Sequence, residues 1–335
     1  MSELLLELRN LCTDFDTDEG RVRAVEDVSF AVKPGETLGI VGESGCGKSV
    51  TALSIMRLLP QPMGQINNGQ ILFEGRDLVD VPLSEMEKIR GDRIGMVFQE
   101  PMTALNPVHT IGKQLAEVLL LHKDITNAEA LQQSVAILAQ VGIPSPDVRM
   151  GEYPHQLSGG MRQRVVIAIA LACKPSLLIA DEPTTALDVT IQAQILELIK
   201  NLQSEMAMSV ILITHDLGVI AETCDSVVVM YAGKVVERGT VFDIFDRPTH
   251  PYTRGLLASI PRLDHERKVK LNTIEGMVPG LHDLPDGCRF ENRCPHKRDI
   301  CDTATPTVET VSGEHQVSCY RWQELEDQTS LAEEP

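Results

Sequence analysis

The feature that most constrains this 335-residue chain is an eight-residue loop, Gly42-Glu43-Ser44-Gly45-Cys46-Gly47-Lys48-Ser49. It fits the pattern G-x-x-x-x-G-K-S/T, which binds nucleotide phosphates where it follows a strand and opens a helix. Both flanks agree with that context. Residues 37–41 are an apolar run typical of a buried parallel strand, and residues 49–53, with Val50, favour the start of a helix. We therefore expect a nucleotide site, and we refer to residues 42–49 as the phosphate loop.

Each part of the phosphate loop has a physical role in that prediction. The glycines allow positive φ, so that backbone N–H groups can wrap around the α- and β-phosphates. The helix N-terminus adds partial positive charge, and Lys48 adds a full charge for the β- and γ-phosphate oxygens. The hydroxyl of Ser49 is suited to hold Mg²⁺.

An acidic pair further along the chain supplies the second half of a nucleotide hydrolase site. Residues 177–180 predict a fully apolar buried strand that runs into Asp181 and Glu182. We expect Asp181 to hold Mg²⁺ through water and Glu182 to act as the general base on the attacking water. Gln99 and His215 also follow apolar strands directly, and the carboxyl ends of parallel strands line the ligand crevice. Gln99 is therefore expected to reach the Mg²⁺ or the water, and His215 to donate to the γ-phosphate.

Two further candidates have ordinary alternatives. Ser158, Gly159 and Gly160 precede a helix predicted over residues 162–173, and a hydroxyl with two glycine N–H groups at a helix start suits a phosphate. A simple helix cap would have the same composition. Phe15 is a candidate to stack on an adenine ring, although a Phe at the edge of the core is an equal expectation.

The rest of the pattern predicts an α/β protein with added parts. Residues 4–8, 24–30 and 36–41 alternate as antiparallel strands do, with turns at residues 18–20 and 33–35. Apolar residues take a helical period between residues 111 and 141, which indicates a helical subdomain at about residues 100–175. After residue 245 the composition changes to a stretch interrupted by Pro and Gly that carries four cysteines. We therefore expect a nucleotide-binding domain at residues 1–245 and a small extension at residues 246–335.

Charge and hydropathy disfavour some partners. A net charge of −18 works against nucleic acid, because phosphate backbones attract basic surfaces. The apolar runs are too short to span a bilayer and no signal segment precedes residues 4–7, so we expect a soluble chain that stays where it is made. Residues 323–335 are acidic and lack an apolar period, which is typical of a frayed tail.

Four of the eight cysteines lie in the extension, spaced C-x5-C-x6-C-x17-C at Cys288, Cys294, Cys301 and Cys319. Such a local group indicates a reduced protein with one metal or cluster site. Structural zinc usually takes close cysteine pairs, whereas longer spacings suit a 4Fe–4S cluster, and Pro295 after Cys294 matches the Cys-Pro of ferredoxin-type runs. A 4Fe–4S cluster that folds the extension is the preferred expectation. Zinc, unliganded thiols and disulfides stay open as alternatives.

The motifs along residues 4–245 resemble, in their order, the ATPase subunit of ABC transporters. They are the phosphate loop, Gln99, residues 157–161, residues 177–182, residues 186–188 and His215. The resemblance implies a P-loop fold and two subunits facing head to tail. Ser158 and Gly160 of one subunit would then contact the nucleotide that Lys48 of the other subunit binds, and Asp188 would lie at the dimer interface. Met161 departs from the family, whose motif ends in Gln, but the contacts there come from Ser and glycine N–H groups, so we expect function to be kept.

Four strings narrow the resemblance to the ATPase subunits of dipeptide and oligopeptide importers: residues 98–107, 153–155, 159–164 and 250–253. The tail cysteines belong to the same pattern, for which a 4Fe–4S cluster is implied. The implied function is a motor that binds and hydrolyses ATP with Mg²⁺. Its implied partners are a homologous ATPase subunit in a heterodimer, two transmembrane permease subunits and an extracytoplasmic peptide-binding protein. The implied place is peripheral, on the cytoplasmic face of the bacterial inner membrane. Nickel and glutathione importers share much of the pattern, so the cargo is implied by resemblance only.

Two other classes of function compete with this one. Soluble ABC ATPases of translation or DNA repair usually carry two motor domains or a long coiled-coil insertion, whereas this chain has one motif set. A regulatory protein with an inactive site is disfavoured because Lys48, Asp181, Glu182 and His215 are all present. The sequence therefore predicts an active ATP hydrolase that drives import.

Overall fold

The computed structural model describes residues 4–99, 104–185, 187–260 and 273–325. The chain divides into two compact units. Unit 1 comprises Met1–Leu6, Val32–Thr37 and Phe73–Ile213, and unit 2 comprises Glu7–Ala31, Leu38–Leu72 and Thr214–Pro335. The predicted frayed tail lies outside the described residues from residue 326 onward. Among the described residues, no helix combines the length and the apolar character needed to cross a membrane.

Unit 1 is built on three short parallel strands, β6 (Ile94–Val97), β7 (Leu177–Asp181) and β8 (Ser209–Ile213). β7 lies between the other two and pairs with both in parallel. Every residue of the three strands is buried. That burial explains why they read as unbroken apolar runs rather than as alternating ones. Their carboxyl ends meet at one edge, where Asp181 ends β7.

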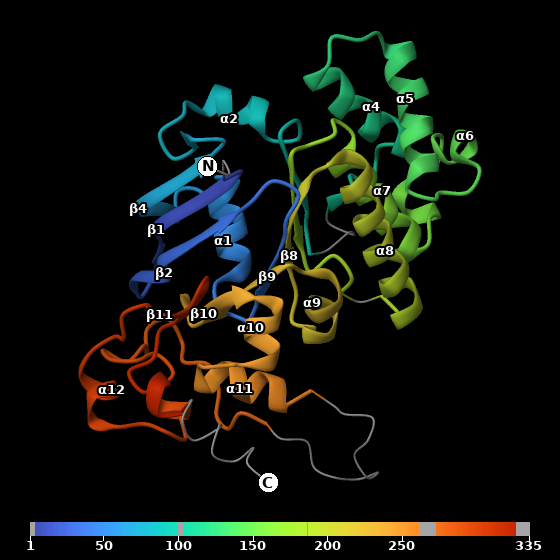
Figure 1. Ribbon diagram of the computed structural model, residues 1–335. Coiled ribbons are helices and arrows are strands. Elements are labelled where there is room, and N and C mark those ends of the chain that lie inside the picture. The colour runs from blue at the N-terminus through green and yellow to red at the C-terminus, as the bar shows by residue number, and fades with distance from the viewer. Residues whose placement is uncertain (1–3, 100–103, 186, 261–272, 326–335) are drawn as a thin grey trace. The chain divides into compact units, whose positions relative to one another are not determined.

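The helical part of unit 1 follows the predicted period. α4 (Ile111–His122) and α5 (Asn127–Gln140) divide the expected helical stretch, because Thr126 caps α5 with a capping box. Both pack against α7 (Gly159–Leu171), which also contacts β6 (Figure 1). α8 follows β7. The remaining elements of this unit are β5 (Arg76–Asp77), α2 (Leu83–Ile89), α6 (Pro146–Arg149), η1 (Pro154–Gln156) and α8 (Val189–Met206).

Unit 2 contains an antiparallel sheet with strand order β2-β1-β4 (Figure 1). These strands are β1 (Leu6–Thr17), β2 (Gly20–Val32) and β4 (Gly64–Phe73). The predicted strands and the turn between them are confirmed, but β1 and β2 are longer than their alternation indicated. The apolar run at residues 71–75 predicts a strand, but β4 begins seven residues earlier, at Gly64, because its first half is mostly polar and gives no apolar signal.

A second run of strands in unit 2 has the order β11-β12-β10-β9-β3. β3 (Thr37–Val41) pairs in parallel with β9 (Ser226–Tyr231), so the grouping of residues 36–41 with the antiparallel strands was wrong and their prediction as a parallel strand is confirmed. Residues 226–231 and 234–238, around Ala232-Gly233, predict a hairpin, and β9 and β10 (Lys234–Thr240) form it. The helices of this unit are α1 (Lys48–Ile55), α9 (Leu217–Thr223), α10 (Val241–Asp246), α11 (Pro251–Ala258) and α12 (Asp299–Thr303), with the turn η2 (Glu291–Arg293).

The extension adds a hairpin that the sequence did not indicate. β11 (Glu309–Ser312) and β12 (His315–Val317) are short and polar, and β12 pairs antiparallel with β10. The carboxylate of Glu237 in β10, a residue that is only 1% exposed, connects β10 with residues 249–250 and with β12. It accepts hydrogen bonds from the backbone N–H groups of Thr249 and His250, at 2.6 and 2.9 Å, and lies 2.8 Å from His315 Nε2. These bonds satisfy a charge that would otherwise be costly to bury.

Candidate functional site

The phosphate loop has the backbone shape that its glycines predict. Gly42, Gly45 and Gly47 take φ of 151°, 79° and 97°, which side chains rarely adopt. Close packing adds a second reason at Gly42, where a Cβ would lie 2.2 Å from the carbonyl oxygen of Met230. α1 begins at Lys48, directly after Gly47, so the loop leads into a helix N-terminus. This end of the helix carries partial positive charge, which favours an anion.

Lys48 lies across this loop rather than pointing to solvent. Its Nζ donates to the carbonyl oxygens of Gly42 at 2.7 Å and Glu43 at 3.1 Å, and the residue is 6% exposed. Cys46 is buried beneath it, and burial raises the pKa of the Cys46 thiol. That thiol is therefore neutral and adds no negative charge next to Lys48.

Unit 1 brings the acidic residues together with Gln99. Asp181 is buried at the end of β7, and the next residue, Glu182, turns the chain at a φ of 47°. The Glu182 carboxylate accepts from Gln99 Nε2 at 3.2 Å and from the Thr185 hydroxyl at 2.8 Å. Its backbone N–H donates to Ile213 at 2.9 Å. Two side chains thus orient the carboxylate.

Thr185 was not singled out from the sequence. Its hydroxyl reaches Glu182 only because the backbone turns at Glu182 and the two residues then lie three apart in a tight loop. A hydroxyl three residues after Glu182, whose general-base role was expected, is the signal that would have identified it.

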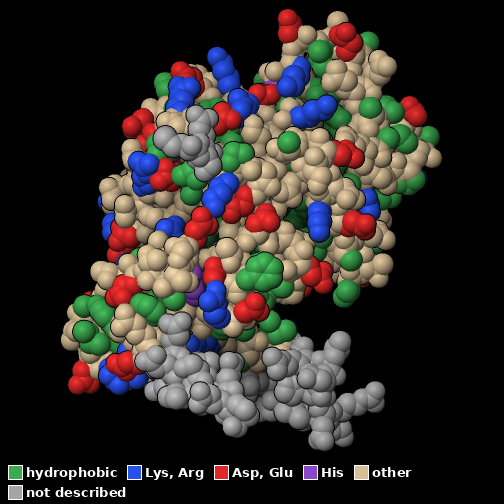
Figure 2. Space-filling view, in the orientation of Figure 1, with side chains coloured by type: hydrophobic (Ala, Val, Ile, Leu, Met, Phe, Trp, Pro, Cys, Tyr) green, Lys and Arg blue, Asp and Glu red, His purple; other side chains and the backbone are tan. Residues whose placement is uncertain are grey.

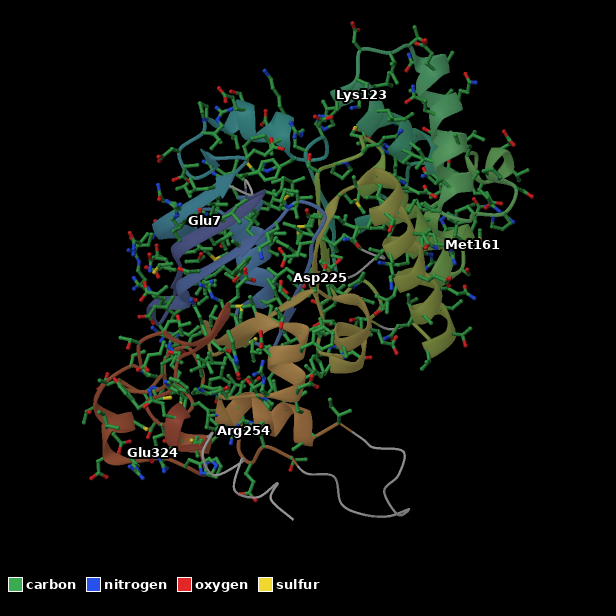
Figure 3. All side chains as sticks on the ribbon, in the orientation of Figure 1. Glu7, Lys123, Met161, Asp225, Arg254 and Glu324 are labelled. Carbon is green, nitrogen blue, oxygen red and sulfur yellow. The ribbon has the colours of Figure 1, made fainter. Side chains whose placement is uncertain are left out.

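Two exposed helix starts also lie side by side in unit 1. Ser158 caps α7 by accepting from Met161 N–H at 3.3 Å, and Asp188 caps α8 by accepting from Ile191 N–H at 3.0 Å. A Cβ on Gly160 would stand 3.0 Å from the Ile191 side chain, so the helix starts touch. Figure 3 labels Met161 on the first turn of α7. Ala186, in the predicted motif at residues 186–188, lies outside the described residues.

His215 and the start of the phosphate loop share a pocket in unit 2. Gly42, Glu43 and His215 line it, with the N-terminal part of α9 and the end of α11, around about 830 Å³ of space that includes open solvent. His215 is exposed. Phe15 is half-buried in β1 and packs against Gly64. Its ring meets the edge of the core there.

The four cysteines of the extension line a single cavity in unit 2 (about 360 Å³ of empty space, part of it open to solvent). Burial, with a smaller contribution from the neighbouring cysteines, raises the pKa of Cys288 to about 12 and of Cys319 to about 11. Backbone N–H groups two residues on face three of the sulfurs, from Phe290 to Cys288, from His296 to Cys294 and from Arg321 to Cys319. Such N–H groups favour thiolates, and thiolates in a buried group need a cation to balance them.

Among the described residues, no three His, Cys, Asp or Glu side chains stand close enough to hold a single metal ion. All eight cysteines fall within the described ranges, and none forms a disulfide there. His250, Glu291 and His296 line the cavity together with the four cysteines.

Comparisons with known proteins agree along the chain. Residues 25–185 match a family model described as ABC transporter, and residues 236–301 match one described as the C-terminal region of oligopeptide/dipeptide transporters. The chain is 54% identical to the dipeptide transport ATP-binding protein DppD of Bacillus subtilis over 326 residues, 97% of this chain and 96% of that one. A probable peptide ABC transporter ATP-binding protein of Sinorhizobium fredii is 52% identical over 97% of each chain.

Two solved structures resemble the fold. The ATP-binding cassette MJ0796, described as a dimeric post-hydrolysis state bound to ADP and Pi, matches with a TM-score of 0.63 and 29% identity, over 70% of this chain and 98% of that one. CbiO1 of Clostridium perfringens, described as part of an ABC transporter complex, matches with a TM-score of 0.62 and 27% identity, over 73% and 92%. The α/β class, with antiparallel and parallel sheets, is confirmed.

Proposed function

Because the chain belongs to the ATP-binding subunits of the ABC oligopeptide/dipeptide transporter family, we propose that it is the motor of a membrane importer for di- and oligopeptides. The chain is an ABC ATPase. The observation that carries the proposal is the phosphate loop, with three glycines at positive φ and a buried Lys48, in one chain with an extension that matches peptide transporters.

We assign residues 1–245 to a nucleotide-binding domain, with a helical subdomain at about residues 100–175, and residues 246–335 to the extension. The two family matches, at residues 25–185 and 236–301, support this division. β12 of the extension pairs with β10, so the proposed boundary separates functions and not independent folding units.

The roles of the site residues follow from their chemistry. The phosphate loop and Lys48 bind the phosphates, and Ser49, Gln99 and Asp181 are the residues that would hold Mg²⁺. Mg²⁺, when bound, neutralises charge on the β- and γ-phosphate oxygens. Glu182 takes a proton from the attacking water, and the bonds from Gln99 and Thr185 support this role because they fix its carboxylate. His215 donates to the γ-phosphate.

The partners are proposed from the surfaces and the relatives. A second, homologous ATPase subunit would present Ser158, Gly159, Gly160 and Asp188 to the nucleotide on Lys48, and the exposure of Ser158 and Asp188 supports this. The dimeric cassette MJ0796 offers a precedent for a dimer. Two permeases and an extracytoplasmic peptide-binding protein complete the importer, which places this subunit on the cytoplasmic face of the membrane. On the face drawn in Figure 2, basic and acidic side chains are interspersed.

A Glu182→Gln substitution in the assembled transporter tests this function. Turnover at this site should fall about 10²–10⁴-fold while ATP stays bound, because only the general base is removed. Uptake of labelled dipeptide should fall with it, whereas Glu197→Gln on the exposed face of α8 should leave both unchanged. Labelled nickel and glutathione, assayed in parallel, distinguish the cargo. Uptake of nickel or glutathione without any transport of dipeptide would contradict the proposal.

We further propose that the cysteine cavity holds a 4Fe–4S cluster. The shared cavity supports it, since all four cysteines line it and each thiolate of a cluster binds a different iron. Anaerobic purification should give a brown protein with about four irons per chain. Cys301→Ser should lose the iron, and Cys173→Ser, buried in unit 1, should keep it. A colourless preparation with stoichiometric zinc would overturn the assignment.

A further inference from the structure

We propose that Arg293 and Tyr252, both outside the motif set, are positioning residues that hold the phosphate loop in its nucleotide-binding shape. Both act on Glu43, the second residue of the loop. The proposal rests on ATP binding, which the family match shows, and is independent of the cargo and of the cysteine occupant.

Arg293 forms a bidentate ion pair with the carboxylate of Glu43. Its Nη1 donates to Glu43 Oε2 at 2.6 Å and its Nη2 to Oε1 at 3.0 Å. The side chain of Arg293 is 4% exposed, against 32% for that of Glu43. Two-pronged pairs of this kind fix geometry as well as charge.

The remaining donors of Arg293 are also used. Nε donates to the carbonyl oxygen of Glu275 at 2.9 Å, and Nη2 donates to that of Ile274 at 3.2 Å. The guanidinium lies 5.8 Å from the ring centre of Tyr231, which adds a cation–π contact. Arg293 therefore has one orientation available, and it aims at Glu43.

Tyr252 holds the backbone of the same loop residue. Its hydroxyl accepts the Glu43 N–H at 2.9 Å from α11. Tyr252 is fully buried, and its ring packs edge-on to Tyr231 at 4.7 Å and against Phe290 at 5.4 Å. The aromatic packing leaves the hydroxyl little freedom, so it defines where the Glu43 amide lies.

Three groups of Glu43 are thus fixed at once. The N–H is held by Tyr252, the carboxylate by Arg293, and the carbonyl oxygen accepts from Lys48 Nζ. Moving Glu43 would therefore move an acceptor of the lysine that binds phosphate. Arg293 also balances the negative charge of Glu43, which would otherwise repel the nucleotide.

A purely structural role makes a different prediction from a positioning role. If Arg293 only tied the extension to the loop, its loss would lower thermal stability and leave nucleotide affinity unchanged. If it positions the loop and cancels the Glu43 charge, its loss should weaken nucleotide binding, and removing the Glu43 charge as well should restore much of it.

The experiment uses the full chain in four forms: wild type, Arg293→Gln, Glu43→Gln and the double variant. The dissociation constant of Mg-ADP is measured by calorimetry, and KM and kcat for ATP in the assembled transporter. Arg293→Gln should raise both the dissociation constant and KM about tenfold, with kcat within about twofold, because one partner of a largely buried pair is lost. The double variant should bind within about threefold of wild type.

Further variants keep the test decisive. Arg293→Lys retains the charge without the fork, so it should recover part of the affinity. Arg298→Gln, whose partner is the exposed Glu324, should change nothing. If Arg293→Gln does not fold, Tyr252→Phe replaces it, because only a hydroxyl is removed and the affinity should fall about fivefold. Wild-type affinity in Arg293→Gln or Tyr252→Phe, or a double variant weaker than Arg293→Gln, would overturn the proposal.

Discussion

The phosphate loop is formed by eight consecutive residues and distant side chains only hold it at Glu43, whereas the cysteine cavity is formed by segments that meet only in the folded chain. Three glycines at positive φ and the start of α1 build the loop within eight residues. The cavity is lined by Cys288, Cys294, Cys301 and Cys319, which come from loops, a turn and one short helix. Both regions suit charged occupants, but one uses local backbone groups and the other uses distant side chains.

This difference predicts how each region fails. A local site is damaged by changes inside it, and the rest of the unit is expected to stay folded around it. A cavity built from distant segments fails when any of the segments shifts. Glu43 connects the two regions, because this residue of the phosphate loop is bound by Arg293, and Arg293 directly precedes Cys294 of the cavity.

The largest effect should follow from removing the charge of the loop. Lys48→Ala should weaken Mg-ATP binding on the order of a hundredfold or more, because a charge-assisted bond to the phosphates is lost. Calorimetry on the full chain measures it. Lys123→Ala is the matched control. Lys123 (labelled in Figure 3) lies at the C-terminal end of α4 and forms an exposed ion pair with Asp92. Iron content should be the same in both variants, and a loss of iron in Lys48→Ala would break the separation between the two regions.

Glycine-to-alanine changes compare the two regions directly. At Gly42 a Cβ would lie 2.2 Å from the Met230 carbonyl oxygen, so Gly42→Ala should cost about 2–4 kcal/mol of stability and most nucleotide binding. Gly45→Ala, also at positive φ but with no atom within 4 Å of its Cβ, should cost about 1 kcal/mol. Denaturant titration of the two variants gives the difference. Equal losses would show that packing against Met230 does not shape the loop.

The corresponding glycine of the cysteine cavity is Gly287. Its Cβ would lie 2.0 Å from the carbonyl oxygen of Cys301, which accepts the N–H of Cys288 at 2.7 Å. Gly287→Ala should therefore push Cys288 and Cys301 apart and lower bound metal, at a cost of about 2–3 kcal/mol. Gly280→Ala meets only the Asp283 carboxylate, at 3.1 Å, and is the control. Full metal content in Gly287→Ala would contradict a cavity of fixed spacing.

The smallest predicted effect is on stability, and it concerns the ion pair between Arg23 and Asp14. These residues are nine positions apart, whereas Arg293 and Glu43 are 250 positions apart. Arg23 Nε donates to Asp14 at 2.8 Å across the β1–β2 hairpin, and this bond, with that from Asn67, holds the pKa of Asp14 below its usual value. The stabilisation is present above the unfolded pKa of about 4 and is lost as the pH falls further. Asp14→Asn should cost about 1 kcal/mol at pH 7, since Arg23 is 40% exposed, and much less at an acidic pH below the lowered pKa of Asp14. Urea titrations at both pH values measure it, and a difference that persists in acid would rule out the ion pair as its source.

Much of the fold could be predicted because its signals are local. The phosphate loop, the apolar strands β3, β7 and β8 and the helical period of α4 and α5 each depend on neighbouring residues. β11 and β12 could not be found in this way, because three or four polar residues carry no period and become strands only by pairing with β10.

The sequence by itself determined the nucleotide loop, the acidic pair Asp181 and Glu182, and the presence of four cysteines in one segment. Only the tertiary structure decided that Gln99 and Thr185 orient Glu182, that the cysteines face one cavity, and that Arg293 and Tyr252 hold Glu43. The physical reason is separation along the chain. Backbone conformation is set by residues a few places apart, whereas an arginine 250 positions from its carboxylate partner is brought to it only when the whole unit packs.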